Sequence, residues 1–252
     1  MNPTDIWIKI CANTSLEDAL LAADAGADAV GFVFASSPRR VTPVQAAEIV
    51  PHLPATLEKI GVFVDASLEE IENTVRVSGL TGVQLHFDAA PDLPARLRGR
   101  FGPDLRILRV VHFETYKAES AAPVSSGPGL VSGHDFSRAE GTAESTWALA
   151  PEGWFKDPNV DAILVDSRTA SAVGGTGQSF DWALASKTLF RNTNARDRIV
   201  AAGGLSPENV AEAIATLRPW GVDVVSGVEA APGRKDPAKV RAFIAQSRNA
   251  AG

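Results

Sequence analysis

The sequence contains a single cysteine, Cys11, where an apolar run gives way to the start signal of a helix. A buried free cysteine usually behaves as a small apolar residue, and inert packing is one interpretation of this one. The positive end of the following helix, however, would lower the thiol pKa and favour the thiolate. The position therefore also suits a thiol held at a strand end as a base or a nucleophile.

A carboxylate occupies a comparable position later in the chain. Asp166 ends the run AILVD, directly after four apolar residues. Partial desolvation at such a place raises the pKa of a carboxyl group toward the range in which it donates a proton at neutral pH. The alternative is that the Asp166 carboxylate only accepts a hydrogen bond from the backbone of the next loop.

Glycine-rich segments follow two consecutive apolar runs and predict a phosphate site. AAGGLSPEN contains Gly203 and Gly204 before a helix that Ser206 caps, with proline at its first position. VVSGVEAAPG places Ser226 and Gly227 after the next run. Backbone N–H groups in loops of this kind bind phosphate.

Other polar groups give weaker signals. Arg39 lies in SSPRRVTP after the second run, and arginine suits a planar carboxylate. The segment VGGTGQSFDW is a third glycine-rich loop but lacks the GK[ST] ending of a nucleotide-binding P-loop. The four histidines are His52, His86, His112 and His134. They show no H-x-x-x-H or Cys/His spacing, so we expect no metal site.

Eight short apolar runs must position these residues. Most are continuously apolar, as in strands buried on both faces of a parallel sheet, and helical patterns separate nearly all of them. The chain of 252 residues therefore predicts one (β/α)8 TIM barrel over residues 1–252, with an open doubly wound sheet as the alternative. The expected strands are residues 6–11, 29–34, 59–64, 82–87, 106–113, 162–166, 198–204 and 222–227.

Helix starts are readable between the runs. SLED, from Ser15 to Asp18, and SLEE, from Ser67 to Glu70, are capping-box patterns.

Residues 114–159 interrupt the alternation of apolar runs and helical patterns, because they are rich in Gly, Pro, Ser and Ala. We interpret them as a long excursion after the fifth strand.

Composition excludes several classes of partner. The net charge is −6 and no Lys/Arg cluster indicates nucleic-acid binding. No apolar run reaches the ~18 residues of a membrane span, and the first residues do not form a secretory leader. One cysteine forms no internal disulfide, which is consistent with a reducing compartment, so we expect a cytoplasmic protein.

Taken together, these segments resemble the phosphoribosylanthranilate isomerase family. The matching stretches are KIC with SLEDAL, GADAVGFVFASSPRRV, GVFVD, GVQLH, VDSRTASAVGGTGQSFDW, AAGGLSPENV and VDVVSGVEAAPGRKD. They occur in family order over nearly the whole chain, apart from residues 114–159.

The resemblance implies a (β/α)8 barrel that isomerises N-(5′-phosphoribosyl)anthranilate in tryptophan biosynthesis without a cofactor. It implies that Cys11 is the general base and Asp166 the general acid. It also implies that Arg39 faces the anthranilate of a small-molecule phosphoribosyl substrate. The other substrate-binding residues it implies are Gly203, Gly204, Asp223, Ser226 and Gly227.

Three positions depart from the family pattern. Ala12 replaces a usual glycine after the cysteine, Phe87 stands where LHG is usual, and Gln178 replaces a lysine at the end of the glycine loop. They keep open a related sugar-phosphate isomerase with a different substrate. A barrel that binds a phosphosugar without catalysis is a third interpretation, and the oligomeric state is left open.

Overall fold

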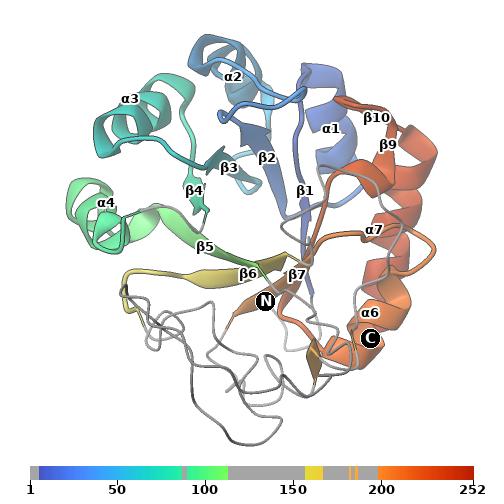
Figure 1. Cartoon of the computed structure of the whole chain (residues 1–252). Coiled ribbons are helices and arrows are strands. Elements are labelled where there is room, and N and C mark those ends of the chain that lie inside the picture. The colour runs from blue at the N-terminus through green and yellow to red at the C-terminus, as the bar shows by residue number, and fades with distance from the viewer. Residues whose placement is uncertain (1–5, 87–89, 113–156, 167–181, 183–184, 187–197) are drawn as a thin grey trace, which may run out of the picture.

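The computed structural model describes residues 6–86, 90–112, 157–166, 182, 185–186 and 198–252. Within these residues the chain forms a closed ring of parallel strands, and helices cover its outside (Figure 1). The predicted (β/α)8 barrel is therefore confirmed. Most of the predicted excursion, residues 114–159, lies outside the described residues, so it stays a prediction, as does its place within a single domain.

The eight barrel strands follow one another in chain order around the ring. Closure comes from β1 and β8, which pair in parallel with Trp7 opposite Gly221 and Ile10 opposite Val224. An open doubly wound sheet has no such pairing, so that alternative is wrong. The strands are β1 (Trp7–Ile10), β2 (Ala29–Val33), β3 (Glu58–Phe63), β4 (Gly82–Leu85), β5 (Arg106–His112), β6 (Ala162–Asp166), β7 (Ile199–Ala202) and β8 (Gly221–Val224).

Helices and one small hairpin surround the ring. The α-helices are α1 (Leu16–Asp24), α2 (Pro43–Ile49), α3 (Leu68–Ser78), α4 (Leu93–Phe101), α6 (Val210–Leu217) and α7 (Pro237–Ala251). Single 3-10 turns span Val50–His52, Gly102–Asp104 and Ser226–Val228. An antiparallel pair, β9 (Glu229–Ala231) and β10 (Arg234–Lys235), follows β8 and was not predicted. No helix among the described residues is long and apolar enough to cross a membrane.

The capping boxes are confirmed at one helix and only half formed at the other. Ser67 accepts from the backbone of Glu70, whose side chain accepts from the backbone of Ser67. Ser15 likewise accepts from the backbone of Asp18, at 3.2 Å. The Asp18 carboxylate instead accepts from the backbone N–H of Lys235, at 3.2 Å, so the start of α1 is tied to β10.

Alternation along each strand separates two apolar layers. Ile8, Ile10 and Phe32 join helix residues in the layer between the strands and the helices. The barrel interior holds another cluster, which includes Trp7, Leu108 and other strand residues. Side chains that share the inward face of β1 with Trp7 are therefore those of Lys9 and, one residue beyond the strand, Cys11.

Candidate active site

Cys11 lies at the C-terminal end of β1, where active sites of these barrels are found. Its backbone N–H donates to the carbonyl of Val224 at 2.9 Å, which fixes the strand end against β8. The residue is only 3% exposed. The turn that follows is held by Asn13, whose side-chain amide donates to the carbonyl of Ile10 at 2.8 Å.

Ala12 forms that turn with a left-handed backbone, at a φ of 61°. This conformation costs a residue with a Cβ about 1–2 kcal/mol, whereas glycine adopts it freely. We therefore expect Ala12→Gly to raise the free energy of unfolding by about 1 kcal/mol. Urea denaturation of the two proteins measures this difference. Equal or lower stability of the variant would show that the turn stores no such strain.

Charged groups surround the thiol inside the barrel. Lys9 is completely buried, and its Nζ donates to Asp223 Oδ1 at 2.9 Å and to Gln84 Oε1 at 2.8 Å. Burial raises the pKa of the Cys11 thiol, while the nearby ammonium groups of Lys9 and Lys235 act to lower it and Asp223 to raise it.

The expectation that a helix dipole lowers the pKa of Cys11 is wrong. α1 begins at Leu16 with Ser15 as its N-cap, so Cys11 lies beyond the reach of its first turn. Desolvation dominates instead, and the net pKa is raised. Lys9, which was not predicted to lie in the site, is the cation that opposes this rise in the thiol pKa most strongly.

Asp166 is the last residue of β6 and is 5% exposed. Its register partners are His112 on β5 and Ala202 on β7. It lies on the same strand face as Leu164, which belongs to the interior cluster. The structure thus places Cys11 and Asp166 at the same end of the barrel, both on inward faces.

Arg39 projects from the loop between β2 and α2 and is held by Glu229. Its Nε lies 2.8 Å from Glu229 Oε1, and its Nη2 lies 2.6 Å from Oε2. The hydrogen bond to Glu229 raises the pKa of Arg39. Burial opposes ionisation of Glu229, but Arg39 and Lys235 keep the pKa of this carboxyl below its usual value. The Arg39 side chain is 22% exposed, against 4% for Glu229.

Lys235 connects this ion pair to the strand that carries the thiol. Its buried Nζ donates to the carbonyl of Cys11 at 2.6 Å and to that of Val225 at 3.3 Å. It also lies 3.5 Å from Glu229 Oε1. Glu229 and Lys235 were not predicted as site residues, although both stand in the segment GVEAAPGRK beside the predicted phosphate glycines.

The two predicted phosphate loops pack directly against each other. Gly203 and Gly204 have left-handed φ values of 84° and 65°, which favour glycine. A Cβ on Gly227 would lie 1.9 Å from the carbonyl oxygen of Leu205, so the β8 loop touches the β7 loop. Ser226 and Gly204 are exposed at this place.

The predicted start of the helix after β7 needs correction. α6 begins at Val210, with Asn209 as its N-cap, and not at the proline that follows Ser206. The Asn209 side chain folds back, accepting from the Ser206 backbone at 2.8 Å and donating to the Gly204 carbonyl at 2.9 Å. These bonds hold residues 204–209 in turns ahead of the helix.

Comparison with known proteins identifies the family. The family model described as N-(5'phosphoribosyl)anthranilate (PRA) isomerase matches residues 8–121 and 152–246. The N-(5'-phosphoribosyl)anthranilate isomerase of Pelobacter propionicus is 42% identical over 240 residues, covering 95% of this chain and 94% of that protein. The chain belongs to the phosphoribosylanthranilate isomerase family. The N-(5'-phosphoribosyl)anthranilate isomerase of Citrifermentans bemidjiense is 40% identical over 247 residues, covering 97% of this chain and 98% of that protein.

Solved structures of the isomerase family share this fold. The enzyme from Thermotoga maritima superposes with a TM-score of 0.73 at 33% identity, covering 97% of this chain and 100% of the other. A phosphoribosyl anthranilate isomerase in complex with reduced 1-(o-carboxyphenylamino)-1-deoxyribulose 5-phosphate gives a TM-score of 0.70 at 31% identity, with the same coverage. The resemblance predicted from the sequence is confirmed.

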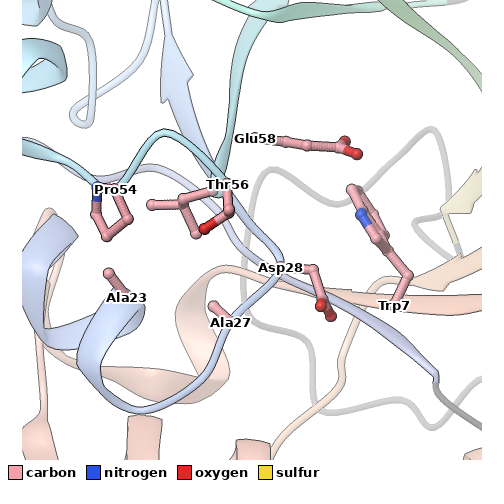
Figure 2. Close-up of a pocket in the computed structure, with 8 residues that line it drawn as sticks. Trp7, Ala23, Ala27, Asp28, Pro54, Thr56 and Glu58 are labelled. Carbon is pink, nitrogen blue, oxygen red and sulfur yellow. The ribbon is translucent and has the colours of Figure 1, made fainter. Parts of the chain in front are cut away.

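A hollow at the opposite end of the barrel is a poor candidate for an isomerase site. It lies at the N-terminal ends of β1 and β3, beside Trp7, Asp28 and Glu58 (Figure 2). The carboxylates of Asp28 and Glu58 already pair with Arg248 and Arg106. These ion pairs tie strand ends together, and the N-terminal face of such barrels serves stability, whereas active sites lie at the C-terminal face.

Two of the three positions that depart from the family pattern, Phe87 and Gln178, lie outside the described part of the chain. His86 follows β4, and its backbone N–H donates to the carbonyl of Phe63 at 3.1 Å. Among the described residues, no group of three or more His, Cys, Asp or Glu side chains is arranged to hold a metal ion.

Asp223, which is predicted to contact the substrate, lies on the inward face of β8, where its carboxylate forms an ion pair with Lys9.

Proposed function

We propose that this member of the isomerase family converts N-(5′-phosphoribosyl)anthranilate to 1-(2-carboxyphenylamino)-1-deoxyribulose 5-phosphate. The observation that carries the proposal is the placement of a buried thiol and a buried carboxylate, Cys11 and Asp166, at the same end of one closed barrel. An Amadori rearrangement needs one acid and one base, and this pair supplies both.

Asp166 acts first, as the acid. Its proton goes to the ring oxygen of the ribose while the bond between C1 and that oxygen breaks. The lone pair of the anthranilate nitrogen then forms a double bond to C1, which gives an open-chain iminium ion. Asp166 is left as a carboxylate close to this cation, and a carboxylate stabilises a developing positive charge.

Cys11 acts second, as the base. Its thiolate removes the proton from C2, and the electron pair of that C–H bond forms a double bond between C2 and C1. The electrons of the iminium bond return to nitrogen, so the product of this step is a neutral enolamine. Proton transfer from the C2 hydroxyl and to C1 then gives the ketone. The protonated imine accepts the electrons, so these steps need no cofactor.

The remaining predicted residues hold the substrate at its two ends. Backbone N–H groups at Gly203, Gly204, Ser226 and Gly227 are proposed to bind the phosphate, where two loops meet. Arg39 is proposed to face the anthranilate carboxylate, and Asp223 to contact the substrate from β8. The net charge of −6 makes these local groups necessary for an anionic ligand.

Glu229 fixes the guanidinium of Arg39, so its removal is expected to weaken substrate binding. We expect Glu229→Gln to raise KM about tenfold, equivalent to ~1.4 kcal/mol, because the charge-assisted bidentate contact is lost. The change in kcat should be smaller. Steady-state kinetics over a range of substrate concentrations measure both constants. A lower KM in the variant would mean that Glu229 competes with the substrate for Arg39.

The proposed location is the cytoplasm. A free thiol that acts as a base needs a compartment that keeps thiols reduced. The single cysteine and the biosynthetic role proposed for the isomerase both agree with that location.

Growth complementation tests the proposed function. The gene for this chain is expressed in a bacterial strain that lacks phosphoribosylanthranilate isomerase and requires tryptophan. Growth without tryptophan, lost when Cys11→Ala is expressed at the same level, is the expected result. Absence of growth despite soluble expression of the unaltered chain would contradict the proposal.

A further inference from the structure

Lys9 is a fully buried lysine in the interior of the barrel, which is a costly place for an ammonium group. Its charge is satisfied by Asp223 on β8 and by the amide oxygen of Gln84 on β4. Because Asp223 is within ion-pair distance, the pKa of Lys9 lies above its ordinary value despite burial. Lys9 therefore remains a cation at neutral pH.

The ammonium arm of Lys9 and the thiol of Cys11 flank the same small space. Lys9 belongs to β1, and Cys11 directly follows that strand two residues later, so the two side chains share the inward face. A Cβ built on Gly31 of β2 would stand 2.4 Å from Cys11 Sγ and 3.1 Å from Lys9 Cε. Any larger residue at position 31 would push the two side chains away, so glycine there lets them lie together.

The other charged groups near the thiol have partners too, so Lys9 differs from them in its position and not in being unpaired. Lys235 of β10 and Arg39 of the β2–α2 loop both pair with Glu229 of β9. Asp223 of β8 pairs with Lys9 and, as an anion, acts against a thiolate. Lys9 is the cation on the strand of the thiol itself, and a cation that close stabilises an anion strongly in a buried site.

We propose that Lys9 is a positioning residue of the isomerase, which holds the Cys11 side chain against Gly31 and stabilises its thiolate. Asp223 and Gln84 in turn hold Lys9 in place. The catalytic consequence rests on the proposed function, but the charge state of the thiol is measured without any turnover.

Titration of the thiol tests this proposal on a single group. Cys11 is the only cysteine of the chain, so the ultraviolet absorbance of its thiolate, measured against Cys11→Ser protein, reports one pKa. In Lys9→Met protein we expect that pKa to rise by about one unit or more, a tenfold loss of thiolate at a given lower pH. In Asp223→Asn protein we expect it to fall, because an opposing anion is gone.

A matched control is Lys59→Met. Lys59 is also a buried lysine of a barrel strand, but its Nζ donates to the carbonyl of Pro54 at 2.6 Å, away from the thiol. Its replacement should leave the pKa of Cys11 unchanged. Circular dichroism verifies that each variant is folded. If Lys9→Met does not fold, Lys9→Gln takes its place, because glutamine is also neutral but can still hydrogen-bond to Asp223.

The two shifts have opposite signs, which a purely structural role does not produce. An unchanged thiol pKa in folded Lys9→Met protein would overturn the proposal. So would a pKa that rises, or does not move, in Asp223→Asn protein. Opposite shifts in the two variants, together with no turnover of the phosphoribosyl substrate by the unaltered protein, would support the role of Lys9 and reject the proposed function instead.

Discussion

Replacing Cys11 with alanine is expected to lower kcat at least about a hundredfold, the lower range for loss of general acid–base catalysis. The thiolate is the group proposed to remove the C2 proton, and alanine has no atom that can accept it. Alanine nearly preserves the packing at this 3% exposed position, so KM should change little. Steady-state kinetics with N-(5′-phosphoribosyl)anthranilate measure both constants.

Cys11→Ser gives a matched comparison for this variant. Serine keeps the size and the polar atom, but its hydroxyl is a far weaker acid than a thiol and does not ionise at neutral pH. We expect it to be as inactive as alanine. Near-normal kcat in Cys11→Ala protein would show that the cysteine is the apolar filler that its burial also permits.

Replacing Asp166 with asparagine is expected to lower kcat by at least about a hundredfold as well. Asparagine has the same shape, yet it has no carboxyl proton to give to the ring oxygen. The ring would then open only as slowly as unassisted chemistry allows. Because asparagine matches the shape of the buried Asp166 side chain at the end of β6, the variant protein should still fold and bind the phosphosugar.

Asp24→Asn is the control for this second variant. Asp24 is exposed at the C-terminal end of α1, remote from the strand ends that carry the site. Its replacement should leave kcat unchanged. Equal kcat values of the Asp166→Asn and Asp24→Asn proteins would show that Asp166 is not the general acid of the reaction.

The strands were predictable because each is a local apolar run that a buried parallel sheet requires. β6 spans Ala162–Asp166 as expected, and the other barrel strands differ from their runs only at the ends. Strand order and the C-terminal location of active sites then placed Cys11 and Asp166 at one end of the barrel. That much follows from patterns within short segments.

The electrostatics of the site were not predictable in the same way. The bond of Lys9 to Asp223 joins residues 214 positions apart, and that of Arg39 to Glu229 joins residues 190 apart. Such pairs depend on closure of the barrel and on the register of β1 against β8. The pKa of Cys11 was not predictable for a related reason, since it is set mainly by the burial that the whole barrel imposes and not by the next helix.

Departures from the family pattern bear on the choice of substrate. Ala12 adopts the left-handed turn that glycine usually occupies, so the backbone path after Cys11 tolerates this change. Phe87 and Gln178 lie outside the described residues, and an altered substrate stays a hypothesis that kinetics must decide. Wild-type activity on N-(5′-phosphoribosyl)anthranilate decides between the isomerase and the other two interpretations of the sequence.

The most direct measurement is therefore turnover by the purified, unaltered chain. N-(5′-phosphoribosyl)anthranilate is generated in situ, and its fluorescence is followed after the protein is added. We predict a protein-dependent loss of fluorescence, with the carboxyphenylamino-deoxyribulose phosphate recovered as product. A folded protein that binds a phosphosugar but leaves this fluorescence unchanged would contradict the isomerase assignment.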